Sequence, residues 1–160
     1  MFKNNIKYEN VKEVTTKGLV DVNYNEFYKK AFELFEEKNT KKYFNKGALL
    51  AGPFWYIYRK MTFRGIAIIG IQVMLATIAY FLKKPIWISL YILSFGFFAY
   101  AGFFGTHTYY RKIISQIEES KKVDKKFLGK YYHDKKGVDR YMTGCWICGT
   151  IVIYYIALFL

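Results

Sequence analysis

Two cysteines lie three residues apart near the end of the chain, at Cys145 and Cys148. This spacing suits a dithiol redox pair or half of a tetrahedral metal site. A zinc site, however, needs four ligands. The chain has only two histidines, His107 and His133, and nothing in the sequence places either of them beside the cysteine pair. We therefore expect the cysteines to act as small apolar side chains, with no bound metal and no cofactor.

A second group of residues is basic and aromatic, a combination that suits a lipid phosphate or an acidic partner. The expected headgroup- or partner-binding residues are Trp55, Tyr58, Arg59, Lys60, Arg64, Tyr109, Tyr110 and Arg111. In the simpler interpretation the basic side chains only anchor the chain at a membrane surface.

Catalytic groups are not apparent in this sequence. We find no nucleophile–base pair, Gly-rich phosphate loop or complete set of metal ligands, and we expect no enzyme activity, with a redox role of the cysteine pair as the alternative. Gln72 is the one strongly polar side chain in its apolar block. A hydrogen bond to a neighbouring helix is the simplest account of it.

Three long apolar blocks must position these residues. Residues 65–82, 85–106 and 141–160 contain no charged side chain and show no polar face. A helix of roughly 20 apolar residues crosses about 30 Å of hydrocarbon. The sequence therefore predicts an all-α integral membrane protein with three transmembrane helices in a membrane domain, residues 65–160.

A shorter apolar stretch, residues 47–58, precedes the first block. As a helix its 12 residues would reach only about 18 Å, and Gly52-Pro53 interrupts it. Because Trp and Tyr side chains favour the headgroup level, we expect residues 44–60 to form a short interfacial or partly re-entrant element.

Residues 23–38 have the spacing of an amphipathic helix. Phe27, Ala31, Leu34 and Phe35 fall on one face, and Tyr24 and Tyr28 extend it. We expect this face to pack on other parts of the chain outside the membrane, with a helix that lies on the membrane as the alternative. Residues 1–22 leave a strand pair and an ordered arm as open alternatives. The second span is expected to continue as a helix to about Lys122, followed by a solvated linker over residues 121–140.

The basic residues predict the orientation. Of the 25 Lys and Arg, residues 1–64 hold 13, residues 107–140 hold 10, and the turn between the first two spans holds only Lys83 and Lys84. By the positive-inside rule, residues 1–64 and the loop 107–140 are cytoplasmic and the C-terminus is external. The net charge of +13 is then explained by the orientation in the membrane and by attraction to anionic lipid, and we expect no binding of nucleic acid.

Small residues recur along the second span, at Gly96, Ala99, Gly102 and Gly105. Such residues let membrane helices approach closely. We expect packing within this chain, with a homo-oligomer seam as the alternative.

The stretch from residue 27 to residue 62, with its Gly-Pro-Phe-Trp core, resembles the domain of unknown function 2628 family of small bacterial membrane proteins, and the resemblance covers about residues 24–118. The matching residues are Phe44, Asn45, Ala48, Gly52, Pro53, Phe54, Trp55, Tyr58, Arg59, Lys60 and Met61, with a later match at Gly102 and Tyr109–Lys112. The chain departs from the family pattern at Lys46 and at Leu49–Ala51. The resemblance implies a location in the bacterial cytoplasmic membrane and no particular activity.

Together these features favour a small membrane interaction or adaptor protein whose cytoplasmic face contacts anionic lipid headgroups or a protein partner. One alternative is an oligomeric pore or a lipid-handling protein. Another is a bacteriocin-immunity or phage-type membrane protein.

Overall fold

The computed structural model describes residues 16–20 and 26–159, and within these residues every regular element is a helix, as predicted. After a short helical stretch at residues 16–20 follow α2 (Glu26–Glu37), α3 (Lys46–Ala51), α4 (Pro53–Tyr58), α5 (Thr62–Leu82), α6 (Pro85–Ser94), α7 (Gly96–Ser120), α8 (Leu128–Lys135) and α9 (Arg140–Phe159). The chain divides into two units. We call Met1–Lys41 with His107–Val138 the charged unit, and Lys42–Thr106 with Asp139–Leu160 the apolar unit.

Two helices in the described residues are long and apolar enough to cross a membrane: α5 and the stretch Pro85–Ser120 formed by α6 and α7. The 21 residues of α5 rise about 31 Å, close to the thickness of a bilayer's hydrocarbon core. Only 28% and 17% of their most apolar windows are buried. The core helix of a soluble protein would be mostly covered, so this exposure fits helices surrounded by lipid.

These two helices coincide with the first two predicted spans, although α5 begins three residues earlier than predicted. The third predicted span coincides with α9, a helix of 20 residues that packs against α4 and α5. Apolar side chains of α9 such as Ile151 and Val152 are exposed.

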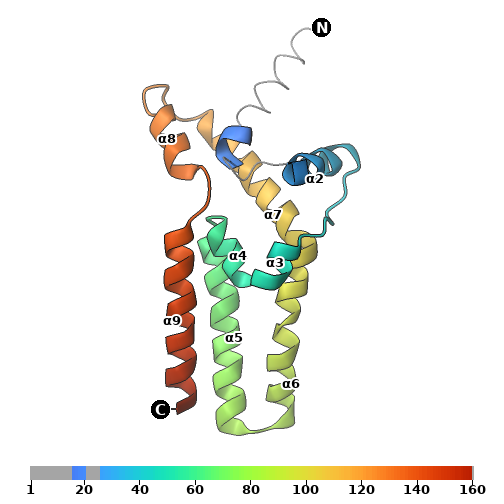
Figure 1. The fold of residues 1–160 in the computed structure, drawn as a ribbon, viewed down its shortest axis with the longest axis vertical. Coiled ribbons are helices and arrows are strands. Elements are labelled where there is room, and N and C mark those ends of the chain that lie inside the picture. Colours follow the sequence, from blue (N-terminus) through green and yellow to red (C-terminus); the bar gives the residue numbers. More distant parts are fainter. Residues whose placement is uncertain (1–15, 21–25, 160) are drawn as a thin grey trace. The chain divides into compact units, whose positions relative to one another are not determined.

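The short elements α3 and α4 lie crosswise between α5 and the first turns of α7 (Figure 1). Gly52 ends α3 and starts α4, and Pro53 takes the first position of α4, where its missing N–H is not needed. The predicted interruption at Gly52-Pro53 is confirmed. We refer to α3 and α4 together as the wedge.

In the charged unit, α2 packs on the second half of α7 through aromatic rings. Tyr28 and Tyr109 have ring centroids 5.8 Å apart, and Phe32 and Tyr110 are 5.1 Å apart. The amphipathic helix is confirmed over Glu26–Glu37, while predicted residues 23–25 lie outside the described residues. Its buried face is Tyr28, Ala31, Phe32 and Phe35. Phe27 and Leu34, which were expected on this face, are not among the buried residues, and the rings of Tyr28 and Phe32 pack on α7.

Two local expectations in the charged unit need correction. Residues 16–20 are helical and do not form part of a strand pair; residues 1–15 and 21–22, where the same question was open, lie outside the described residues. Within the predicted linker, α8 forms a helix that includes Gly129. It is held to α7 because the Tyr131 hydroxyl donates to the Gln116 carbonyl at 3.1 Å.

Candidate functional site

The predicted binding residues fall into both units. Trp55, Tyr58, Arg59, Lys60 and Arg64 belong to the apolar unit, and Tyr109, Tyr110 and Arg111 belong to the charged unit. Each group is therefore considered by itself.

In the charged unit, the two tyrosines hold helices together. Tyr109 is 1% exposed and lies among the rings of α2, and the Tyr110 hydroxyl donates to Glu36 Oε1 at 2.8 Å. Arg111 is exposed. This geometry gives Tyr109 and Tyr110 a packing role and leaves Arg111 on the surface.

In the apolar unit, the basic residues differ in exposure. Arg59 ends α4 and is 5% exposed, with its guanidinium carbon 5.5 Å from the centroid of the Tyr58 ring. Lys60 follows with a left-handed φ of 56° in the turn to α5. Arg64, in contrast, lies in the first turn of α5 and is exposed. Arg64 is therefore the arginine of this group that a ligand outside the chain can reach.

The wedge is fastened to α7 by hydrogen bonds around Asn45. The Asn45 N–H donates to the Gly102 carbonyl at 2.8 Å, and the Tyr43 N–H donates to the Phe103 carbonyl at 3.0 Å. The Asn45 side chain caps α3 by accepting from the Ala48 N–H at 3.0 Å, and its amide donates to Thr106 Oγ1 at 3.2 Å. One side chain thus starts α3 and binds it to α7.

Small residues let the wedge come close to the long helices. A Cβ added at Gly102 would lie 2.9 Å from Leu49 Cβ, and one added at Gly65 would lie 2.6 Å from the Pro53 carbonyl. At Gly52, where φ is 50°, an added Cβ would lie 2.5 Å from the Phe98 ring. These positions require glycine because a side chain at Gly102 or Gly65 would collide with the wedge, and one at Gly52 would collide with Phe98 of α7.

The predicted small-residue stripe on α7 therefore divides into two halves. Gly102 and Gly105 face the wedge, with Leu49 and Trp55 as their respective neighbours. Gly96 has nothing within 4 Å of an added Cβ, and Ala99 is exposed. Packing within the chain accounts for the half of the stripe nearer the wedge.

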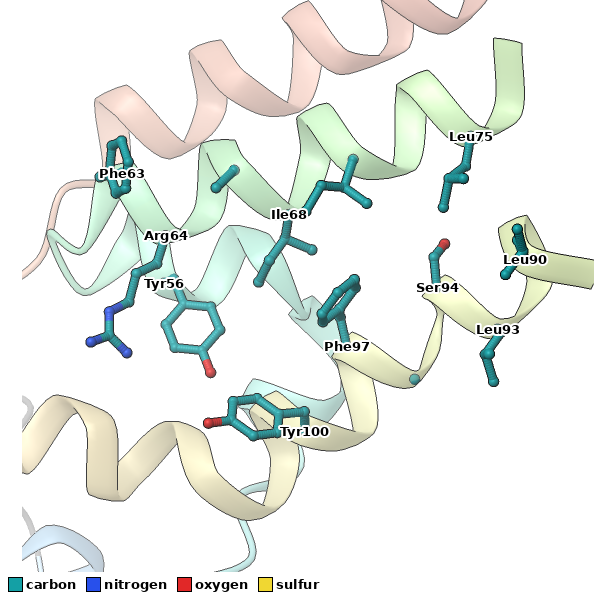
Figure 2. Close-up of a pocket in the computed structure, with 13 residues that line it drawn as sticks. Tyr56, Phe63, Arg64, Ile68, Leu75, Leu90, Leu93, Ser94, Phe97 and Tyr100 are labelled. Carbon is teal, nitrogen blue, oxygen red and sulfur yellow. The ribbon is translucent and has the colours of Figure 1, made fainter. Parts of the chain in front are cut away.

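An open groove of about 650 Å³ lies between α5 and the α6–α7 stretch, next to the wedge (Figure 2). From α5 come Arg64, Ile68, Ile71 and Leu75, from α6 and α7 come Leu90, Leu93, Ser94, Phe97 and Tyr100, and from α4 comes Tyr56. Arg64, Ile68, Ile71 and Leu75 recur at helical spacing and so form one continuous stripe along α5. The groove is therefore a long, mostly apolar channel along a helix pair.

The polar groups of the groove gather at one end. Figure 2 shows Arg64, Tyr56 and Tyr100 together at the end where α4 lies, with Ile68, Phe97, Leu75 and Leu93 extending away from them. Tyr56 is 2% exposed and Tyr100 is 50% exposed. Burial raises the pKa of Tyr56 to about 12, which keeps its hydroxyl protonated and able to donate at neutral pH. The groove is thus amphipathic along its length.

The cysteine pair and Gln72, which the sequence analysis singled out, lie outside the groove. Cys145 and Cys148 are free thiols on exposed positions of α9, not buried packing residues. Among the described residues no three His, Cys, Asp or Glu are grouped to hold a metal. Gln72 is buried on α5, and its side-chain nitrogen makes no hydrogen bond to the described part of the chain.

Among the groove residues, sequence reasoning named Arg64 as a binding residue and Gly96 only as a packing residue. Tyr56 and Tyr100 were missed because they are 44 positions apart and meet only through the packing of the wedge. The apolar stripe that follows Arg64 at helical spacing was the one local signal that could have indicated the groove.

Comparison with known proteins finds one matching family. Residues 10–114 match the model of the family described as protein of unknown function (DUF2628). This region includes α2, the wedge, α5, α6 and most of α7, and so contains the whole groove. No curated protein and no solved structure is significantly similar to the chain. Because the match extends over more than half of its length, the chain belongs to the DUF2628 family.

Proposed function

We propose that this chain is a multi-pass protein of the bacterial cytoplasmic membrane that handles lipid, holding one acyl chain in the groove between α5 and the α6–α7 stretch. The three crossings are α5, α6–α7 up to about residue 106, and α9. The N-terminus is cytoplasmic and the C-terminus external, as the distribution of Lys and Arg favours.

The single observation that carries this proposal is the groove itself. It is apolar along most of its length, it is open, and it lies between helices whose outer faces are also apolar and exposed. In a bilayer such a groove is in contact with acyl chains, which are present there at far higher concentration than any other apolar molecule. An elongated apolar chain is therefore its natural occupant.

The experiment fills the groove without disturbing the helix that forms it. Ile71 lines the groove and is 41% exposed, so Ile71→Trp adds a large ring inside the groove while the backbone of α5 stays as it is. Met74, 53% exposed on the same helix, does not line the groove, and Met74→Trp is the matched control.

Each protein would be released gently from native membranes and weighed by native mass spectrometry. We expect the wild-type chain and Met74→Trp to retain a lipid, and Ile71→Trp to lose most of it. Equal lipid retention by Ile71→Trp and the wild type would overturn the proposal.

An adaptor role is the second candidate, and it is favoured by one feature of the charged unit. Between α7 and α8, Lys121, Lys122, Lys125 and Lys126 are exposed, and Phe127 beside them is 53% exposed. A basic surface with an exposed ring suits an acidic protein partner. Changing these four lysines to glutamine should then release a co-purifying protein, and an unchanged set of co-purifying proteins would contradict the adaptor role.

A further inference from the structure

The acyl chain does not by itself give the groove selectivity. Lipid tails are as apolar as leucine, so moving a tail from the bilayer into the groove gains little hydrophobic free energy. Selection among lipids must come from the polar end of the groove, where Arg64, Tyr56 and Tyr100 lie. The chemistry of these three side chains therefore indicates which lipid fits.

We infer that the groove selects an anionic glycerophospholipid, whose phosphate is bound by the Arg64 guanidinium and the hydroxyls of Tyr56 and Tyr100. This inference rests on the proposed lipid-handling function and names the headgroup class for the same groove. Guanidinium presents a planar fork of N–H donors that matches two phosphate oxygens, and each phenol adds one O–H donor.

The charge of Arg64 is available to such a ligand. The sequence contains no Asp or Glu between Glu37 and Glu118, so no acid is close to Arg64 along the chain. The apolar unit has one acidic residue, Asp139, and its carboxylate accepts from the Met142 N–H at 2.8 Å. Among the described residues no carboxylate forms an ion pair with Arg64.

The same lack of acidic residues argues against a zwitterionic lipid. A phosphatidylcholine or phosphatidylethanolamine headgroup carries a cation next to its phosphate. That cation would meet Arg64, and none of the described residues that line the groove is a carboxylate, so its repulsion would offset part of the phosphate's attraction. A headgroup without a cation, such as phosphatidylglycerol, avoids this cost.

The position of Arg64 also assigns the lipid to one leaflet. Arg64 lies in the first turn of α5, just after residues 1–64, and the apolar stripe of the groove extends from it toward Lys83 at the far end of the helix. With the N-terminus cytoplasmic, the bound phosphate lies at the cytoplasmic surface and the tail extends into that leaflet.

The experiment measures headgroup preference in nanodiscs that contain equal amounts of dioleoylphosphatidylglycerol and dioleoylphosphatidylcholine. Lipids that stay bound after transfer to detergent are counted by native mass spectrometry. We expect the wild-type chain to retain phosphatidylglycerol roughly tenfold over phosphatidylcholine, the ratio expected when one charge-assisted hydrogen-bond set is gained.

Three variants isolate the headgroup contacts. Arg64→Gln should still hold a lipid but lose most of the preference, and Tyr56→Phe should lower it by a few-fold. Arg140→Gln is the matched control, because Arg140 also lies in the first turn of a long helix of the apolar unit but does not line the groove. It should keep the wild-type preference.

The outcomes separate this inference from the proposed function. If wild-type chain and Arg64→Gln hold lipid with the same headgroup ratio, the inference is wrong and the lipid groove stands. If Arg140→Gln loses as much preference as Arg64→Gln, general surface charge explains the selection and the inference is again wrong. If Ile71→Trp retains as much lipid as the wild-type chain, the proposed function fails, whatever the headgroup variants show.

Discussion

Arg59 and Arg64 lie five residues apart in one motif, and their surroundings differ. Arg59 is buried and lies against the Tyr58 ring, so its long stem contributes packing as well as charge. Arg64 is exposed at the polar end of the groove. Two arginines close together in the sequence can therefore differ in role: Arg59 contributes to packing, whereas Arg64 is the one that the proposed ligand can reach.

The glycines of α7 also differ in their surroundings, since Gly102 is closely packed and Gly96 is not. This difference yields a stability prediction. Gly102→Ala places a Cβ 2.9 Å from Leu49 Cβ, whereas Gly96→Ala meets nothing within 4 Å. Overpacking of this kind costs about 1–3 kcal/mol. We expect Gly102→Ala to unfold at lower temperature in detergent, and Gly96→Ala to match or exceed the wild-type stability because alanine favours helix. Equal melting temperatures for the two variants would contradict the close packing of the wedge on α7.

At the scale of elements, the sequence predicted the long helices best. Uninterrupted apolar runs require helices, because only an internally bonded backbone is stable in hydrocarbon. The helices α5, α6–α7 and α9 fall within a few residues of the ranges that were predicted on this basis. The amphipathic pattern of α2 and the break at Gly52-Pro53 were also local signals, and both were read correctly.

Elements that depend on distant contacts were not predictable in this way. The helix α8 was missed because Gly129 suggested a break, while the bonds from Tyr131 and Tyr132 to α7 that hold α8 cannot be read from its own sequence. The groove was missed for the same reason, since Tyr56 and Tyr100 come together only after the wedge docks. Of its polar end, the sequence identified Arg64 alone.

The docking of α8 can be tested at Tyr131. Its hydroxyl lies 3.1 Å from the Gln116 carbonyl oxygen and 3.0 Å from Glu119 Oε2. We expect Tyr131→Phe to loosen α8 without affecting α5, and a lysine-specific protease should then cut faster within residues 125–136. Tyr141→Phe, at a side chain that is 84% exposed, is the control and should not change the cutting. Unchanged cutting of Tyr131→Phe would mean that these bonds do not hold α8.

The same contact predicts a pH dependence. Burial and the hydrogen bond with Glu119 raise the pKa of Tyr131 to about 12, above its usual value of about 10. Docked α8 therefore holds this proton more tightly than undocked α8, so the stabilisation is complete below about pH 10 and is lost as the pH rises toward 12. In a difference ultraviolet titration, the tyrosinate signal that Tyr131→Phe removes should appear near pH 12. A signal near pH 10 would show that the hydroxyl is not held.

At the scale of the whole molecule, charge and hydropathy are divided between the two units. The apolar unit holds one acidic residue, and the charged unit holds the remaining described Asp and Glu. In the proposed topology, the apolar unit would lie in the bilayer and the charged unit in the cytoplasm, in keeping with this division.

The proposed three crossings give a direct topology test. With Cys145 and Cys148 changed to serine, Lys84→Cys should react with a membrane-impermeant thiol reagent on intact spheroplasts, because the α5–α6 turn is external. Lys125→Cys, in the cytoplasmic loop, should react only after the membrane is opened. The reverse pattern would invert the orientation and move the groove's polar end to the outer leaflet.

The bond between Asn45 and Thr106 joins residues 61 positions apart, and this distance has a consequence for biosynthesis. The ribosome makes the wedge well before Gly102, Phe103 and Thr106, the residues of α7 to which it bonds. A nascent chain that ends before Gly102 therefore leaves the wedge undocked, whereas one that extends past Thr106 contains all three of these partners. The family motif is made early but reaches its final place only after this part of α7 has been made.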